Sequence, residues 1–374
     1  MLTTNSRVAI VSLRKKNNFI YNSCLYEFED LIREVDSVDL IELLPTDPLG
    51  TFSYRVIKKT AEFFKPFTTV TPPLQNAIEL DREYDLLFII ADFPYNILNI
   101  NAIEKWREKS KIAVCYLIEL WNTEIDKYKN YLNFLGRFDY VFLGHSQIVP
   151  EVARITQKPC SYLAPACDTV RFMPRKPQGN RAIDLCSMGR RSQITHQALL
   201  ELTTKEDFFY HYDYLKTSNL YIDNHQAHRI KNANILKNSR YFIAHHAKIN
   251  VLEQTGGQIE IGYRFFEGAA AGTVMLGTPP NNEVFQQYFG WDNAVIPMKF
   301  DEANIAEMIA EYDRNPQLLQ SISNNNVSNS LLSNDWVHRW EQVLNTVGLP
   351  TTDKLDKRKH QLRQLADSFT AVES

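Results

Sequence analysis

The residues best suited to chemistry lie in the segment Gly262–Gly277. Arg264 and Glu267 are three positions apart there, so a helix would bring both side chains to one face. A run of small residues follows, and Thr273–Leu276 then has the continuous apolar character of a short buried strand. Small residues at the start of a helix would let a ligand approach, and a helix N-terminus attracts phosphate. Because a carboxylate can accept the hydroxyls of a ribose, the segment predicts a nucleotide site.

A second candidate site is Met188–Ser192, which follows one predicted strand and precedes a helix predicted around Gln197–Leu202. It contains Arg190 and Arg191, and the guanidinium fork matches the oxygens of a diphosphate. Two exposed arginines are the alternative interpretation. Lys248, in the loop predicted after His245 and His246, is a weaker phosphate candidate.

The sequence offers little support for a metal site. It contains no Asp-x-Asp, the pattern that holds a divalent cation on a diphosphate. Several histidines crowd one region without metal-ligand spacing, and we expect them to be hydrogen-bonded or solvated: His211, His225, His228, His245 and His246. We therefore predict no metal and no cofactor.

Size and composition indicate a globular protein with two domains. The chain has 374 residues, 44% of them apolar and 23% charged, and its net charge of −3 gives no basic field for nucleic acid. The five scattered cysteines favour reduced core residues, and neither a signal peptide nor an apolar span of membrane length is visible. We expect a cytoplasmic location. The stretch Phe52–Phe67 has basic and aromatic residues like an interfacial helix, but a helix packed on a sheet has the same pattern and is favoured.

Short apolar runs alternate with longer polar or amphipathic stretches, which predicts βαβ units and parallel sheets. The predicted strands are Val8–Leu13, Leu86–Ala91, Ile112–Ile118, Tyr140–Leu143, Ile183–Met188, Phe208–Tyr212, Tyr241–Ala244, Val274–Leu276 and Ala294–Ile296. The predicted helices are Leu25–Arg33, Ile57–Phe64, Ile103–Lys109, Val149–Ile155, one from about Glu302 with Asp301 as N-cap, one from Pro316, one around Trp336–Leu344 and a charged one over Lys354–Phe369. The proline-rich stretch Ser161–Pro177 reads as a linker.

The segment Arg264–Gly272 resembles the Arg-x-Phe-Glu-Ala-x-Ala-x-Gly pattern of GT-B glycosyltransferases, in particular the CgeB-like group and other enzymes with a family 1-type donor domain. The resemblance extends weakly from about Ile183 to Leu344, and Asp335–Trp340 is similar to the terminal helix without its usual His. It implies two Rossmann-like domains whose parallel sheets face a cleft, with C-terminal helices that cross back to the first domain. The expected segments are an acceptor domain over 1–165, a donor domain over 178–340 and a helical tail over 341–374.

The resemblance also implies roles for individual residues. Glu267 would bind the ribose of the donor, and Arg264 would pair with Glu267 or reach a phosphate. Gly262 stands at the family's Gly position, whereas the usual first acid is replaced by Ile259, with Glu260 beside it. We expect Glu260 at the sugar hydroxyls. Gly272 and Thr273, which end the small-residue run, complete the predicted donor site.

In this fold the group that activates the acceptor, or stabilises an oxocarbenium-like centre, lies in the first domain at the carboxyl end of a strand. Polar residues that follow predicted strands there are Asp92, Glu119 and His145. The sequence does not separate these three candidates.

The sequence therefore predicts a metal-independent glycosyltransferase that moves a hexose from a nucleotide-diphosphate sugar to an unknown acceptor, which is a glycan, lipid, protein or small molecule. Two alternatives stay open: a nucleotide-sugar epimerase on the same fold, and a GT-B protein that binds a sugar nucleotide or glycan without turnover. A Rossmann dehydrogenase is disfavoured because no G-x-G-x-x-G follows a predicted strand.

Overall fold

The computed structural model describes residues 6–44, 77–177, 179–213 and 220–370. Contacts divide the chain into two compact units. The first comprises Met1–Asn18, Ile32–Ala164 and Thr346–Leu349, and the second comprises Phe19–Leu31, Pro165–Asn345 and Pro350–Ser374. The division into segments 1–165, 178–340 and 341–374 stays a prediction. In the structure, the N-terminal part of helix α1 (Ser23–Val35) and the helix of the tail belong to the second unit.

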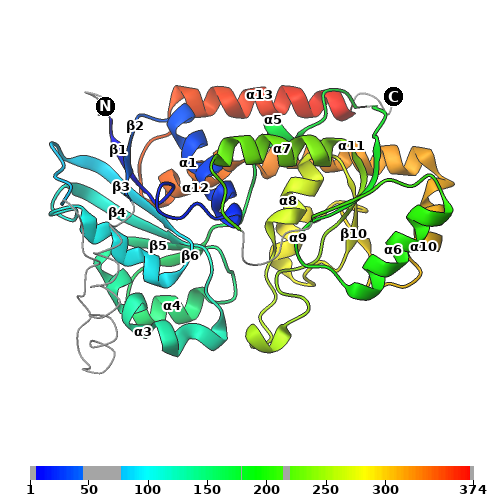
Figure 1. Ribbon diagram of the computed structural model, residues 1–374. Coiled ribbons are helices and arrows are strands. Elements are labelled where there is room, and N and C mark those ends of the chain that lie inside the picture. Colours follow the sequence, from blue (N-terminus) through cyan, green and yellow to red (C-terminus); the bar gives the residue numbers. More distant parts are fainter. Residues whose placement is uncertain (1–5, 45–76, 178, 214–219, 371–374) are drawn as a thin grey trace. The chain divides into compact units, whose positions relative to one another are not determined.

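The first unit is built on a parallel sheet (Figure 1). In the described residues its strand order is β2-β1-β3-β4-β5-β6. The strands are β1 (Val8–Ser12), β2 (Val38–Glu42), β3 (Tyr84–Ala91), β4 (Ser110–Leu117), β5 (Tyr140–Leu143) and β6 (Cys160–Tyr162). A 3-10 helix, η2 (Pro94–Ala102), follows β3, and helices α3 (Ile125–Phe134) and α4 (Val149–Thr156) follow β4 and β5. Its core is aliphatic and aromatic, as near-continuous apolar strands require.

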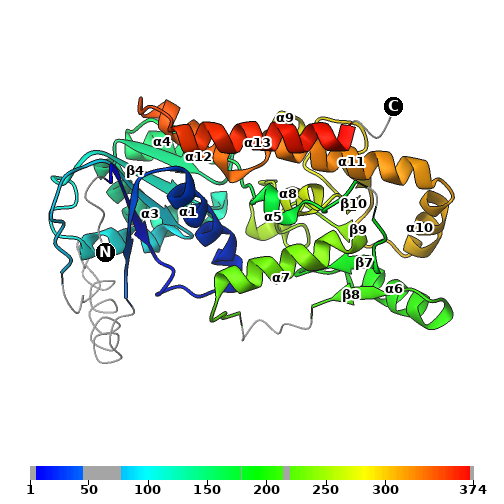
Figure 2. The ribbon, with the colours of Figure 1, turned by 90° about the horizontal axis from the view of Figure 1, so that it is seen from above.

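The second unit carries a second parallel sheet, of order β11-β10-β9-β7-β8 in the described part of the chain. Its strands are β7 (Ile183–Ser187), β8 (Tyr210–Tyr212), β9 (Ser239–Ile243), β10 (Val274–Gly277) and β11 (Ile296–Pro297). Its helices beyond the linker are α6 (Gln193–Lys205), α7 (His225–Lys237), α8 (Tyr263–Ala270), α9 (Glu283–Phe289), α10 (Ile305–Asp313), α11 (Pro316–Ser333), α12 (Trp336–Thr346) and α13 (Asp353–Thr370). Helix α13 packs along α11 (Figure 2).

The predicted α/β class with two parallel sheets is confirmed, and all nine predicted strands are present. The structure has two further strands, β2 and β6, which the sequence pattern did not predict. The linker stretch Ser161–Pro177 is more regular than predicted, because it contains most of β6 and a short helix, α5 (Thr169–Phe172), whose N-cap is Asp168. The predicted helix Ile57–Phe64 and the stretch Phe52–Phe67 lie outside the described residues.

Two local predictions are wrong. Ile103–Lys109 forms turns instead of a helix, because the backbone around Ile103 bonds to Ile78 in an isolated bridge. Helix α10 starts at Ile305 with Asn304 as its cap, so Asp301 is not the N-cap. Its carboxylate instead accepts the hydroxyl of Ser192 at 2.5 Å.

All five cysteines are free thiols; Cys160 is half-buried and the others are buried. No helix in the described part of the chain is long and apolar enough to cross a membrane.

Candidate functional site

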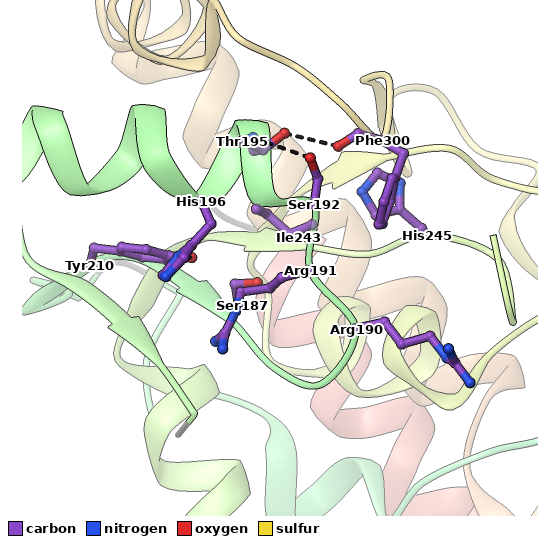
Figure 3. Close-up of a pocket in the computed structure, with 10 residues that line it drawn as sticks. All are labelled: Ser187, Arg190, Arg191, Ser192, Thr195, His196, Tyr210, Ile243, His245 and Phe300. Atoms are coloured by element: carbon purple, nitrogen blue, oxygen red, sulfur yellow. Dashed lines mark hydrogen bonds between the residues drawn. The ribbon is translucent and has the colours of Figure 1, made fainter. Parts of the chain in front are cut away.

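The second sheet has a topological switch point between β7 and β9. The chain leaves β7 to form β8 on one side and returns to place β9 on the other. In open parallel sheets, ligands bind at the carboxyl ends of the strands at such a point. A small pocket lies there (Figure 3). It is lined by Ser187, Arg190, Arg191, Ser192, Thr195, His196, Tyr210, Ile243, His245 and Phe300.

Helix α6 directs its N-terminus at this pocket. Ser192 caps the helix by accepting the backbone N–H of Thr195 at 3.2 Å, and the Thr195 hydroxyl donates to the Phe300 carbonyl at 2.9 Å (Figure 3). The first N–H groups of a helix have no partner within the helix and carry a partial positive charge. The pocket therefore combines a helix N-terminus with two arginines, which is a setting for an anion.

Arg264 adds a third cation to this edge of the sheet. Its guanidinium lies over Gly189, whose φ of 72° and missing Cβ permit the approach, because a Cβ would collide with Nη2 of Arg264. Among the described residues Arg264 has no hydrogen bond and no ion pair. Burial lowers its pKa, despite the opposing charges of Glu267 and Asp213. A half-buried guanidinium without a partner is stabilised by an anion brought by a ligand.

The structure revises the role predicted for Arg191. Its guanidinium donates to the Asp213 carboxylate at 3.0 Å and to the Asp213 carbonyl at 2.8 Å, and it lies over the ring of Tyr212. Within the described residues, Arg190 makes one long contact, of 3.5 Å, with Asn250. Of the three arginines at this edge of the sheet, Arg190 and Arg264 therefore have no carboxylate partner in the described part of the chain. Lys248, with a φ of 54°, follows β9 but does not line the pocket.

Glu267 lies in the middle of α8, where its carboxylate accepts a hydrogen bond from Nη1 of buried Arg229. Arg229 also donates to both oxygens of Glu27, at 3.1 and 3.0 Å. These three residues come from α8, α7 and α1. No other hydrogen bond to the Glu267 side chain forms within the described residues, which leaves Oε2 without a partner there.

The small residues of α8 do not open the helix as predicted. The helix begins at Tyr263, with Gly262 as its N-cap, and the small residues fall at its C-terminal end. A Cβ at Gly268 would meet Phe242 and Met275, so the absence of a side chain lets α8 pack closely on the sheet. These residues serve packing, not ligand access.

Three predicted donor residues have structural partners. Gly272 (φ 64°) ends α8 beside Val327, and the buried Thr273 donates its hydroxyl to the Gly268 carbonyl at 3.0 Å. Both stand where β10 begins, at the opposite end of the sheet from the pocket. The buried carboxylate of Glu260 accepts a hydrogen bond from Gln258 at 2.9 Å. The site as assembled does not include these three residues.

In the first unit, the three predicted catalytic residues meet at the carboxyl ends of β3, β4 and β5. The Asp92 carboxylate accepts from Asn96 and from the N–H of Phe93, which fixes the start of η2. Glu119 accepts the indole N–H of Trp121 at 2.7 Å, and the ring of His145 packs on Trp121 with centroids 4.3 Å apart. His145 Nδ1 donates to the Leu120 carbonyl at 2.9 Å, since a carbonyl only accepts. Its Nε2 therefore presents a lone pair, with no partner among the described residues.

Within the residues that the structure describes, no group of three or more His, Cys, Asp or Glu side chains could hold a metal ion. Of the clustered histidines, His225 bonds to Asp30 at 3.0 Å and His245 to Thr278. His245 is a pocket residue that sequence reasoning missed.

The chain is similar to known proteins, in sequence over part of its length and in fold. Residues 207–345 match the family described as glycosyl transferase-like. No curated protein matches the sequence. The crystal structure of Anabaena HepE in complex with UDP-glucose is similar, with a TM-score of 0.50, 12% identity and coverage of 91% of this chain and 99% of that chain. The S. aureus MnaA–UDP structure reaches a TM-score of 0.48 at 10% identity, covering 93% of this chain and 100% of that one.

The resemblance to GT-B glycosyltransferases is thereby confirmed. The chain has the GT-B fold, and its residues 207–345 match the glycosyl transferase-like family.

Proposed function

We propose that this protein transfers a hexose from a nucleotide-diphosphate sugar to an acceptor hydroxyl, without a metal ion. The observation that carries the proposal is the unpaired guanidinium of Arg264 beside the pocket at the switch point of the second sheet. The glycosyl transferase-like match over residues 207–345 supports the reaction class, and the UDP-glucose bound by HepE supports the donor class.

The second unit binds the donor in this proposal. Arg264, Arg190 and the N-terminus of α6 neutralise the diphosphate, in place of the cation that an Asp-x-Asp site would supply. Oε2 of Glu267 accepts a ribose hydroxyl while Arg229 holds Oε1. These interactions strengthen as the sugar leaves, because the departing diphosphate gains negative charge.

The first unit supplies the base. His145 is the strongest of the three candidates, because Asp92 and Glu119 already accept strong hydrogen bonds whereas Nε2 of His145 has a free lone pair. As the acceptor oxygen bonds to the anomeric carbon and the bond from that carbon to the phosphate oxygen breaks, Nε2 takes the hydroxyl proton. The Leu120 carbonyl keeps the ring in the tautomer that this step needs.

The first experiment is a thermal-unfolding screen of nucleotide sugars in buffer with EDTA, run on the wild type and on Arg264→Met. A ligand present at about 100 times its Kd should stabilise the wild type by roughly 2.7 kcal/mol. The variant should need a higher ligand concentration for the same stabilisation. Failure of every nucleotide sugar, or stabilisation only after Mn²⁺ or Mg²⁺ is added, would contradict the proposed donor site.

The second experiment incubates the stabilising donor with acceptor mixtures and analyses all sugar products, again with EDTA. We expect new glycosides together with free nucleoside diphosphate. An altered nucleotide sugar without any acceptor would identify an epimerase. Binding without any turnover would identify a non-catalytic sugar-nucleotide protein.

A further inference from the structure

His245 stands where β9 meets the pocket, two residues after the end of the strand. His245 is only 5% exposed, and its ring lines the pocket with Ile243 and Phe300 (Figure 3). The ring of Phe300 packs against it edge-on, with centroids 5.3 Å apart. The imidazole is therefore held on two sides and faces the space where a ligand would lie.

One ring nitrogen of His245, Nδ1, has a hydrogen-bond partner in the main chain. The backbone N–H of Thr278, just beyond β10, donates to Nδ1 at 3.0 Å. The Thr278 hydroxyl lies 3.3 Å from the same atom but gives its hydrogen to the Met298 carbonyl at 2.7 Å. Since a backbone N–H can only donate, Nδ1 must carry the lone pair.

The proton of the ring is consequently on Nε2. Burial, with the positive charges of Arg264 and His246, lowers the pKa of His245 to about 4, so the imidazole is neutral near pH 7. A neutral imidazole with a lone pair on Nδ1 has its N–H at Nε2, on the far side of the ring from Thr278. Within the described residues this N–H has no acceptor. A buried donor without an acceptor is unfavourable, and a ligand oxygen removes that cost.

We propose that His245 is a donor-recognition residue whose Nε2–H binds a phosphate oxygen of the nucleotide-diphosphate sugar. This inference rests on the proposed function and deepens it. A phosphate oxygen is the favoured acceptor because Arg190 lines the same pocket and Arg264 lies close enough to His245 to lower its pKa. Thr278 acts as the positioning residue, because its N–H decides which nitrogen carries the proton.

Two substitutions separate the ligand bond from the structural bond. In His245→Asn, the amide oxygen stands near Nδ1 and can still accept the Thr278 N–H, but nothing replaces Nε2–H. In His245→Gln, the longer side chain places an amide N–H near Nε2 but loses the bond to Thr278. Calorimetric titration would use the nucleotide sugar that best stabilises the wild type, the matching nucleoside diphosphate and the matching nucleoside, each paired with a thermal melt.

We expect His245→Asn to keep the wild-type melting temperature and to lose about tenfold to a hundredfold in affinity for the sugar nucleotide and the diphosphate. Affinity for the nucleoside should not change. His245→Gln should melt earlier and retain most of the diphosphate affinity. The opposite pattern, in which His245→Asn binds the diphosphate normally and His245→Gln binds it weakly, would overturn the inference. Because the wild type must bind the sugar nucleotide in the same series, failure of the proposed function appears separately, as absence of wild-type binding.

Discussion

The carboxyl edges of the two sheets have the same topology and opposite chemistry. Each sheet is parallel and each has a switch point, between β1 and β3 in the first and between β7 and β9 in the second. The first edge gathers Asp92, Glu119 and His145, groups that take or hold protons. The second edge gathers Arg190 and Arg264, which offer positive charge to an anion. In the function we propose, the first edge supplies the base and the second edge binds the diphosphate.

The two histidines show how the backbone decides this difference. His145 and His245 each follow a strand closely and each use Nδ1 to contact the main chain. His145 meets a carbonyl, so its Nδ1 is protonated and its Nε2 accepts. His245 meets an N–H, so its Nδ1 accepts and its Nε2 donates. The same residue type can therefore act as a proton acceptor at one edge and as a hydrogen-bond donor at the other.

The largest effect should come from His145→Asn. The Asn amide can still donate to the Leu120 carbonyl, so the fold is kept while the proton acceptor is lost. General-base catalysis typically contributes 10²- to 10⁴-fold, so kcat should fall by about that factor. Donor affinity, measured by titration, should stay unchanged. If Glu119→Gln lowers kcat as much and His145→Asn does not, the base is Glu119 and the comparison of the two histidines fails.

Glu267→Gln should change both binding and stability. Hydrogen bonds to charged groups contribute about 1.5–3 kcal/mol, so donor affinity should fall by about tenfold to somewhat over a hundredfold. The free energy of unfolding should also fall by about 1–3 kcal/mol, because buried Arg229 loses one of its two carboxylate partners. The matched control is Glu27→Gln, which should destabilise the fold without changing donor affinity. If the two variants behave alike in both measurements, Glu267 has only a structural role.

Arg264→Met and Arg191→Met compare an unpaired guanidinium with a paired one. Loss of Arg264 should weaken donor binding by about tenfold or more and leave the melting temperature equal or higher, because a half-buried charge without a partner is removed. Loss of Arg191 should lower the melting temperature, because Asp213 loses its partner, and should affect binding less. Equal losses of affinity in the two variants would contradict the assignment of the diphosphate to Arg264 and Arg190.

The smallest effect concerns pH. The native pKa of His245 is about 4, below its ordinary value of 6.5, so the unfolded chain binds a proton that the folded one does not. Stability is therefore lost as pH falls from about 6.5 toward 4, by about 2 kcal/mol between pH 7 and 5 for this group. Denaturant unfolding at both pH values should show a smaller loss in His245→Asn than in the wild type. Equal losses would place the native pKa of His245 near its ordinary value.

The sequence revealed the elements that are continuously apolar and missed the others. β2 alternates buried and half-buried residues, and β6 has three residues, so neither forms an apolar run. At the site, Arg190 and Arg264 were found because strand, loop and helix follow one another along the chain. The hydrogen-bond network around Glu267 was not predicted, because Arg229 and Glu27 come from helices that are distant in sequence. His245 was missed although a signal existed: it closely follows a buried strand, as His145 does.

The most direct test of the opposite roles of the two edges is the ¹⁵N NMR spectrum of the histidine side chains at neutral pH, with and without the stabilising nucleotide sugar. His145→Asn and His245→Asn would assign the signals. We expect a proton on Nδ1 of His145, which faces the Leu120 carbonyl, and a neutral ring protonated on Nε2 for His245, and the donor should shift the Nε2–H of His245. The same tautomer at both positions, or a donor that leaves His245 unshifted, would contradict it.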